Sequence, residues 1–336
     1  MIMRALVFTG PGRAEVREVP APVAGAGEVV VDVELAGVCG TDVELFTGEM
    51  SYLHSGRSTY PLRPGHEWSG IVTATGRGVD ESWLGRRVTG DTMIACGDCR
   101  RCRGGRHHVC AGMRELGIAD GRPGALAEQL AFPAAYLHAL PDPVDATLGA
   151  LVEPGGNAQR AVDAAGLRPG ERLLIAGTGT IGLLAAMIAR SRSIEVHLLG
   201  EHLEFARSLG FADAHPLGTL PELPWDAVID ATNGPAVPDL AVRLVEPGRR
   251  VVYIGLSGTP STVDSRDIVL KDVTAVGILG ASAGLAPVVR AYADGLVDPR
   301  PLVAAVTALA DVAGVLAGNR PPGAGTGPKF LVDPRR

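Results

Sequence analysis

Residues 171–189 read ERLLIAGTGTIGLLAAMIA, and this stretch decides the fold. An aliphatic run of strand length leads into the pattern Gly177-x-Gly179-x-x-Gly182, and an apolar run of helix length follows. Glycines here permit a tight turn and let backbone amides approach a pyrophosphate at the helix N-terminus. The glycine pattern alone is a weak signal, which the preceding strand and the following helix strengthen. We therefore expect a nucleotide site formed by Gly177, Gly179, Thr180, Ile181 and Gly182.

A second strand is expected at residues 194–200, with an acidic residue at its end to bind the ribose. Glu201 lies 19 positions after Gly182 (201 − 182). A carboxylate there would accept hydrogen bonds from the ribose hydroxyls of NAD and repel the 2′-phosphate of NADP. We expect NAD. NADP stays open as the alternative, because His197 could take this position instead and His202 with Arg207 could bind a phosphate.

Further strands are expected at residues 227–230, 250–256 and 274–281, with a turn at residues 246–248. Helical stretches between these strands favour right-handed crossovers and a parallel sheet. The expected fold class is α/β, with a Rossmann-type parallel-sheet domain over residues 148–282.

The composition sets outer limits on function. A chain of 336 residues is long enough for about two domains. Lys plus Arg (31) against Asp plus Glu (37) give a net charge of −6, which argues against a nucleic-acid partner. Two uncharged runs, residues 173–189 and 273–289, approach the length of a membrane span, but their glycines indicate buried strand and turn segments. The N-terminus lacks a signal-peptide pattern, so we expect a cytoplasmic protein without a membrane partner.

Four of the five cysteines form a cluster, CGDCRRCRGGRHHVC, over residues 96–110. In a cytoplasmic chain, clustered cysteines favour a metal over disulfides, and short C-x-x-C spacings let thiolates converge on one tetrahedral ion. Four sulfur ligands close the coordination shell, so we expect a structural zinc. An iron–sulfur cluster and a metal-free reduced cluster are the alternatives. His107 and His108 are interpreted as solvated loop residues. The expected ligands are Cys96, Cys99, Cys102 and Cys110.

Two motifs lie upstream: GVCGTD at residues 37–42 contains Cys39, and PGHEWSG at residues 64–70 contains His66 and Glu67. Together with the cysteine cluster, Val152-Glu153-Pro154 and the glycine turn, they follow the order found in zinc-dependent medium-chain alcohol dehydrogenases. The chain resembles this family over nearly its whole length. The phrases HEWSG and ELGIADG (residues 115–121) resemble its polyol, sugar and aminocyclitol branch most.

The resemblance implies a mainly β, GroES-like catalytic domain with a zinc-knuckle lobe, formed by residues 1–147 with 283–336 returning to it. It also implies two zinc ions per chain. The second, catalytic zinc would have an open position for water or substrate. Neighbouring side chains of a strand point to opposite faces, so His66 and Glu67 can reach one ion only if Pro64 and Gly65 bend the chain. The implied ligands of the catalytic zinc are Cys39, His66, Glu67 and Glu153.

Proton transfer at this site is implied to begin at Thr41. Glu44 occupies the position where relatives commonly carry His; it is either the next member of the relay or a plain surface acid. Asp42 is expected to orient His66. Another departure from the family is Gly155-Gly156-Asn157, where relatives commonly carry bulkier residues. The candidate catalytic residues are Thr41, Glu44 and Glu67.

The function implied by the resemblance is zinc- and NAD(P)-dependent hydride transfer between a nicotinamide cofactor and a secondary alcohol on a polyol, sugar or cyclitol. A dehydrogenase or reductase of simple alcohols and carbonyls is one alternative. A non-catalytic NAD- and metal-binding protein on the same scaffold is another. The expected partners are a small alcohol or carbonyl substrate and further copies of the chain in a homodimer or homotetramer.

Overall fold

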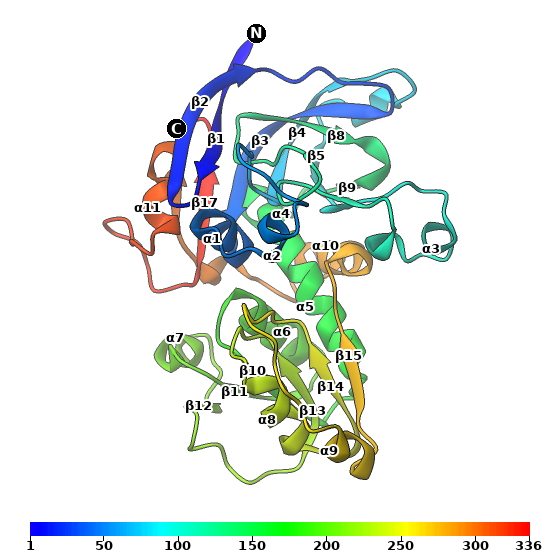
Figure 1. Ribbon diagram of the computed structural model, residues 1–336, viewed down its shortest axis with the longest axis vertical. Helices are drawn as coiled ribbons and strands as arrows, with labels where there is room; N and C mark the ends of the chain where they lie inside the picture. The colour runs from blue at the N-terminus through cyan, green and yellow to red at the C-terminus, as the bar shows by residue number, and fades with distance from the viewer. The chain divides into compact units, whose positions relative to one another are not determined.

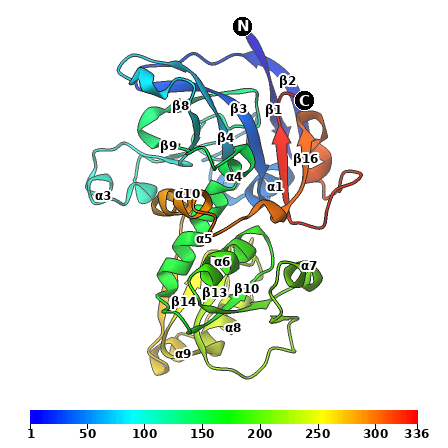
Figure 2. The same cartoon turned by 180° about the vertical axis from the view of Figure 1, so that it is seen from behind.

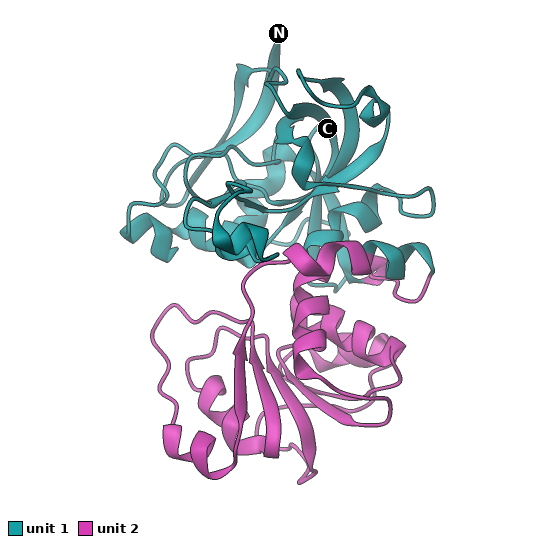
Figure 3. Ribbon diagram, turned by 90° about the vertical axis from the view of Figure 1, so that its right-hand side faces the viewer, with its two compact units in different colours: residues 1–153, 289–294, 302–336 teal, residues 154–288, 295–301 magenta.

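The structure is a computed structural model that describes residues 1–336 and separates them into two compact units (Figure 3). Unit 1 comprises Met1–Glu153, Val289–Asp294 and Leu302–Arg336, and unit 2 comprises Pro154–Val288 and Gly295–Pro301. The domain boundaries expected at residues 148 and 282 stay a prediction. No helix in the structure combines the length and apolar character needed to span a bilayer.

Unit 2 is built on a parallel six-stranded sheet in the order β12-β11-β10-β13-β14-β15. In chain order this is 3-2-1-4-5-6, the arrangement of a dinucleotide-binding sheet, with the reversal point beside β10. The predicted Rossmann-type fold is confirmed. The strands are β10 (Arg172–Ala176), β11 (Glu195–Leu199), β12 (Ala214–His215), β13 (Trp225–Asp230), β14 (Val245–Tyr253) and β15 (Thr274–Gly277).

Helices connect these strands and cover both faces of the sheet (Figure 3). Right-handed crossovers that run in opposite directions from β10 place their helices on opposite faces. Helix α6 packs its apolar side against β10 and β11, while α8 covers the face that carries Leu174, Leu199 and Val251. The helices with residues in this unit are α5 (Val152–Ala165), α6 (Thr180–Ser191), α7 (Leu203–Ser208), α8 (Val237–Leu244), α9 (Ser265–Leu270) and α10 (Leu285–Ala293).

Three local predictions in unit 2 are wrong. The turn expected at residues 246–248 lies inside β14, where the pairing with β13 jumps from Trp225–Val245 to Ala227–Arg250. The extra residues form a bulge, in which Gly248 adopts the left-handed region that favours glycine. The strand expected at residues 250–256 begins at Val245 and ends at Tyr253, and the strand expected at residues 274–281 ends already at Gly277.

Unit 1 contains a seven-stranded sheet in the order β16-β17-β3-β4-β5-β9, with β8 also paired to β3. Its C-terminal strands lie beside β3, as Figures 1 and 2 show by the red and blue ribbons. This pairing places the C-terminal strand β17 next to residues 36–38 near the N-terminus. The strands are β3 (Glu28–Val38), β4 (Glu67–Thr75), β5 (Arg87–Gly90), β8 (Gln129–Pro133), β9 (Leu137–Ala139), β16 (Val303–Ala308) and β17 (Lys329–Asp333).

The core of unit 1 lies against this sheet and around Trp68 and Phe132, whose rings meet edge to face at 5.2 Å. A hairpin of β1 (Ile2–Gly10) and β2 (Arg13–Pro20) adds Leu6 and Phe8 to the core, and β6 (Met93–Ile94) pairs with β7 (Arg114–Glu115). The helices of this unit are α1 (Gly40–Thr47), α2 (Ser51–His54), α3 (Arg100–Arg103), α4 (Ala146–Ala150) and α11 (Val312–Leu316).

Candidate active site and metal centres

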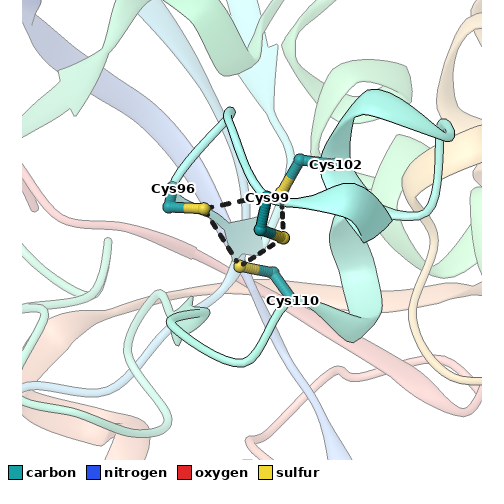
Figure 4. A group of neighbouring side chains, drawn as sticks. All are labelled: Cys96, Cys99, Cys102 and Cys110. Carbon is teal, nitrogen blue, oxygen red and sulfur yellow. Dashed lines mark hydrogen bonds between the residues drawn. The ribbon is translucent and has the colours of Figure 1, made fainter.

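The four clustered cysteines converge on one point (Figure 4). Their sulfur atoms lie 3.5 Å apart for Cys99–Cys102 and Cys96–Cys110, 3.8 Å for Cys99–Cys110 and 3.9 Å for Cys96–Cys102. In a tetrahedron with Zn–S bonds of about 2.3 Å, sulfur atoms are separated by about 3.8 Å. The residues present therefore fit a closed four-sulfur zinc site.

Backbone hydrogen bonds in this cluster lower the pKa of two of its thiols, and thiolates are the form that binds a metal. Backbone N–H groups of Asp98 and Cys99 lower the pKa of the Cys96 thiol to about 6, and those of Cys102 and Arg101 help lower the pKa of Cys99. Desolvation and neighbouring sulfurs raise the pKa of Cys102 to about 12, so its proton would leave only when an ion binds. Both effects suit a site that forms together with its metal.

The interpretation of His107 as a solvated loop residue is wrong. Its ring is half-buried, its Nε2 lies 2.7 Å from Asp91 Oδ2, and it packs against the ring of Tyr136. These contacts make His107 a packed structural residue of the lobe, and it is not part of the group of four cysteines.

The second candidate metal centre begins at Cys39, which caps helix α1. The backbone N–H of Cys39 donates to Asp42 Oδ2 at 2.9 Å, which fixes the first turn of the helix. Ligand atoms of Cys39, His66 and Glu67 lie within 4.8 Å of one another, and His66 and Glu67 are buried. A thiolate, an imidazole and a carboxylate form a donor set typical of zinc with an open position.

The bend expected before His66 is present. Gly65 has φ 101°, and a Cβ there would come within 2.6 Å of the backbone nitrogen of Leu126. Because β4 begins only at Glu67, His66 lies outside the strand, and the two side chains are free of strict alternation. The glycine therefore brings neighbouring residues to one site.

A buried ion pair that sequence reasoning missed holds Glu67. Lys329 Nζ donates to both carboxylate oxygens of Glu67, at 2.6 and 2.9 Å, and to the carbonyl of Val38 at 2.9 Å. Both side chains are at most 2% exposed. The chain has only two lysines, and the apolar run that follows Lys329 was the available signal that one is buried. Glu67 is thus held as a carboxylate at the edge of the site.

The buried charges at this site depend on one another. Burial alone would lower the pKa of His66, but the acidic groups of Cys39, Asp42 and Glu153 outweigh it and raise that pKa. Burial also raises the pKa of Asp42. Asp42 Oδ1 and His66 Nδ1 face each other at 3.8 Å, and neither has a hydrogen-bond partner. Such orphaned buried atoms fit a ring that is oriented by Asp42 when a metal ion is held on its other side.

Glu153, at the start of α5, is buried but lies outside the group formed by Cys39, His66 and Glu67. Its charge still acts on His66. The structure therefore brings three of the four expected ligands together and leaves Glu153 as a neighbouring carboxylate.

Thr41 and Glu44 stand three residues apart on α1, so they lie on the same face of the helix. Both are partly exposed, whereas Asp42 is fully buried. Desolvation and the charge of Glu49 raise the pKa of Glu44, which brings it closer to the range in which a carboxyl group exchanges protons near neutrality. The Thr41 hydroxyl and the Glu44 carboxyl are thus two partly exposed groups on one face of α1 that could exchange protons with water.

The nucleotide motif has a separate reason for each glycine. Gly177 has φ 110°, and a Cβ on Gly182 would come within 1.9 Å of the carbonyl oxygen of Gly177, so the turn and the helix–strand packing both require glycine. A Cβ on Gly179 would meet nothing within 4 Å. Gly179 also caps α6, which begins with Thr180 and Ile181. Open space at a helix N-terminus fits a pyrophosphate.

Glu201 is exposed and follows the carboxyl end of β11, where its carbonyl accepts a hydrogen bond from the Thr178 hydroxyl. His197, the alternative for the ribose position, lies within β11 with its side chain buried. The geometry thus favours Glu201 over His197.

The glycines at 155 and 156 belong to α5, and Gly156 has a packing role. A Cβ on Gly156 would come within 2.9 Å of Ala281 Cβ, and one on Gly284 would come within 2.1 Å of the Gly156 carbonyl oxygen. The close approach of α5 to residues 281–284 explains why a bulkier residue does not occur at 156 in this chain.

Comparison with known proteins places this geometry in a family. Residues 25–142 match the model of the alcohol dehydrogenase GroES-like domain. The L-threonine 3-dehydrogenase of Saccharopolyspora erythraea is 34% identical over 83% of this chain and 84% of that protein. The 2-dehydro-3-deoxy-L-galactonate 5-dehydrogenase of Pseudoalteromonas atlantica is 32% identical over 87% of this chain and 88% of that protein.

Solved structures agree over the whole chain. A protein described as a short chain alcohol dehydrogenase, from Escherichia coli CFT073 and in complex with NADH, is 26% identical, with a TM-score of 0.89 and 99% of both chains covered. A protein from Sinorhizobium meliloti 1021 bound to NADP is 28% identical, with a TM-score of 0.87 and 99% and 100% of the two chains covered. The predicted GroES-like and Rossmann-type architecture and the predicted enzyme class are thereby confirmed. The chain belongs to the zinc-dependent medium-chain alcohol dehydrogenases, which use NAD or NADP.

Proposed function

We propose that this dehydrogenase oxidises a secondary alcohol on a substrate that carries further polar groups, with Cys39, His66 and Glu67 as the zinc-binding residues. The observation that supports it most is the converging, buried donor set of these three residues in unit 1. The two curated relatives are named for dehydrogenation at position 3 of L-threonine and at position 5 of a sugar acid, both secondary alcohols. Glu153 is proposed as a further carboxylate that approaches this group when metal is bound.

Zinc bound by these residues would supply a Lewis acid that lowers the pKa of a substrate hydroxyl toward neutrality. The residues of α1 have a complementary task, because the hydroxyl proton must reach water before hydride can leave the carbon atom. Thr41 would accept that proton and pass it on, and Glu44 would exchange it with solvent. Glu67, held by Lys329, would balance the positive charge of the centre.

A substrate panel tests the proposed function. The zinc-loaded protein is assayed with NAD against L-threonine, polyols, sugars, cyclitols and simple primary and secondary alcohols, and NADH formation is followed. We expect the highest kcat/KM for a polar secondary alcohol. A preference for simple alcohols would support the first alternative, and NAD binding without turnover on the whole panel would support a non-catalytic protein.

Replacing Thr41 by Ala should lower turnover by about 10²-fold while the zinc content stays unchanged, because a positioned proton-transfer group contributes about 10²- to 10⁴-fold. Steady-state kinetics and metal analysis of the same sample measure both quantities. Glu44→Gln separates the two readings of that residue: a relay member loses turnover, and a plain surface acid does not. Wild-type turnover in Thr41→Ala would refute the relay.

We also propose NAD as the preferred cofactor, bound through Glu201. Replacing Glu201 by Ser should raise the ratio of kcat/KM for NADP to that for NAD by about 10- to 100-fold, because about 1.4–2.8 kcal/mol of repulsion disappears. Glu204→Ser is the matched control, since Glu204 is also exposed and lies three residues further on. An equal shift in both variants would mean a general charge effect and would contradict the assignment of Glu201.

A further inference from the structure

We propose that His197, Asp213 and His215 form a further metal site, at the edge of the sheet in unit 2, for a divalent transition ion such as Zn²⁺. Ligand atoms of these three residues lie within 4.8 Å of one another. None of them belongs to the candidate centres at Cys39 or at the four-cysteine cluster. The site is therefore independent of the function proposed above.

The register of two strands brings the three side chains together. Strand β12 pairs with β11 in parallel, with Leu198 opposite Ala214 and Leu199 opposite His215. His197 and His215 therefore share one face of the sheet. Asp213 lies two residues before His215, and residues two apart in an extended chain point to the same side. The arrangement is fixed by backbone hydrogen bonds from Leu198 to Asp213 and from Gly200 to His215.

Hydrogen bonding leaves one nitrogen of His197 available to a metal. His197 Nε2 lies 2.8 Å from Glu195 Oε1, and Arg172 holds the same carboxylate with bonds of 2.6 and 3.1 Å. A carboxylate that already accepts from Arg172 also accepts from His197, so Nε2 is the donor in this contact. The other ring nitrogen, Nδ1, has no hydrogen-bond partner and is the atom that would face an ion. A carboxylate behind the ring is the usual partner of a metal-binding histidine.

Two buried nitrogen atoms at this site lack any hydrogen-bond partner. His197, which is 4% exposed, has an unpartnered Nδ1, and His215 has an unpartnered Nε2. The two rings are nearly parallel, with centroids 5.8 Å apart, and the edge of Trp225 packs on His197. Buried orphaned nitrogens are rare and need an explanation.

The donor chemistry selects the ion. Two imidazoles and one carboxylate suit zinc and neighbouring transition ions, and they suit magnesium or calcium poorly. Donors about 2.1 Å from one ion are separated by about 3–4 Å, so only small side-chain adjustments are required. Asp213 is exposed and provides the approach from solvent. An ion here would fasten the two-residue strand β12 to β11, next to the turn that carries Glu201.

Metal counting tests this site on the full-length protein. The metal-free protein is equilibrated with buffered free Zn²⁺, and the bound zinc per chain is measured. We expect His215→Gln to hold one zinc ion fewer than the wild type, and Asp213→Asn to need at least tenfold more free zinc to fill the same equivalent. Both residues are at least partly exposed, so the variants avoid the buried ring of His197. Unchanged melting temperatures of the metal-free variants would verify their folding.

His202→Gln is the matched control, because His202 is an exposed histidine of the same unit outside the cluster. It should bind as much zinc as the wild type. Cys39→Ser distinguishes this site from the proposed catalytic centre: the zinc lost with Cys39 and the zinc lost with His215 should be separate and additive. Equal zinc binding by the wild type and His215→Gln at every free zinc concentration would overturn the proposal and leave a bridging water as the partner of the two nitrogens.

Discussion

Cys39→Ser should lower the turnover of alcohol by about 10³-fold or more and remove one zinc ion per chain. Lewis-acid stabilisation contributes several kcal/mol to the transition state, and about 4 kcal/mol corresponds to about 10³-fold in rate. Serine keeps the size of the residue but replaces the thiolate that zinc prefers. Steady-state kinetics together with zinc analysis measure the effect.

Cys102→Ser is the control for this experiment, because it removes a ligand of the other centre. The variant should also lose one zinc ion and loosen the lobe at residues 96–110, yet it should keep turnover within about tenfold of the wild type, because a closed four-sulfur site offers no position to substrate. If Cys102→Ser lost turnover as severely as Cys39→Ser, the division into a structural and a catalytic centre would be wrong.

The local parts of this protein could be predicted from its sequence. The three glycines of residues 177–182 stand at fixed spacing between an aliphatic strand and a helix, and Gly177 and Gly182 each have a steric reason in the structure. The bend at Gly65 followed from the adjacency of His66 and Glu67. The cysteine cluster was evident because its ligands are close in sequence. In each case, neighbours along the chain determine the geometry.

Contacts that depend on strand register could not be predicted in this way. Lys329 and Glu67 are 262 positions apart, and they meet only because β17 and β4 both pair with β3. His197 and His215 likewise share a face only in the observed register of β11 and β12. A register shift of one residue would turn either side chain to the other face of the sheet. Composition and spacing carry no information about such register.

The pair of Lys329 and Glu67 gives the largest expected effect on stability. In the metal-free protein, Lys329→Met removes the ion-pair partner of Glu67 and leaves a carboxylate at 1% exposure without compensation. Breaking a buried ion pair in this way costs about 3–5 kcal/mol. The free energy of unfolding, measured by denaturant titration, should fall by that amount. Lys271→Met is the matched control: Lys271 is partly exposed and bonds only the carbonyls of Val242 and Arg243, so its loss should cost about 1 kcal/mol.

The double variant Lys329→Met/Glu67→Gln identifies the cause of the loss. Because it removes both charges, no uncompensated carboxylate stays buried, and much of the lost stability should return. If the double variant were as unstable as the sum of the single variants, the loss would come from packing and from the bond to Val38 instead of from the ion pair. Catalysis should not return with stability, because the double variant still lacks the carboxylate that would balance the metal centre. Stability and turnover should therefore separate in this one protein, which a purely structural role of Glu67 would not produce.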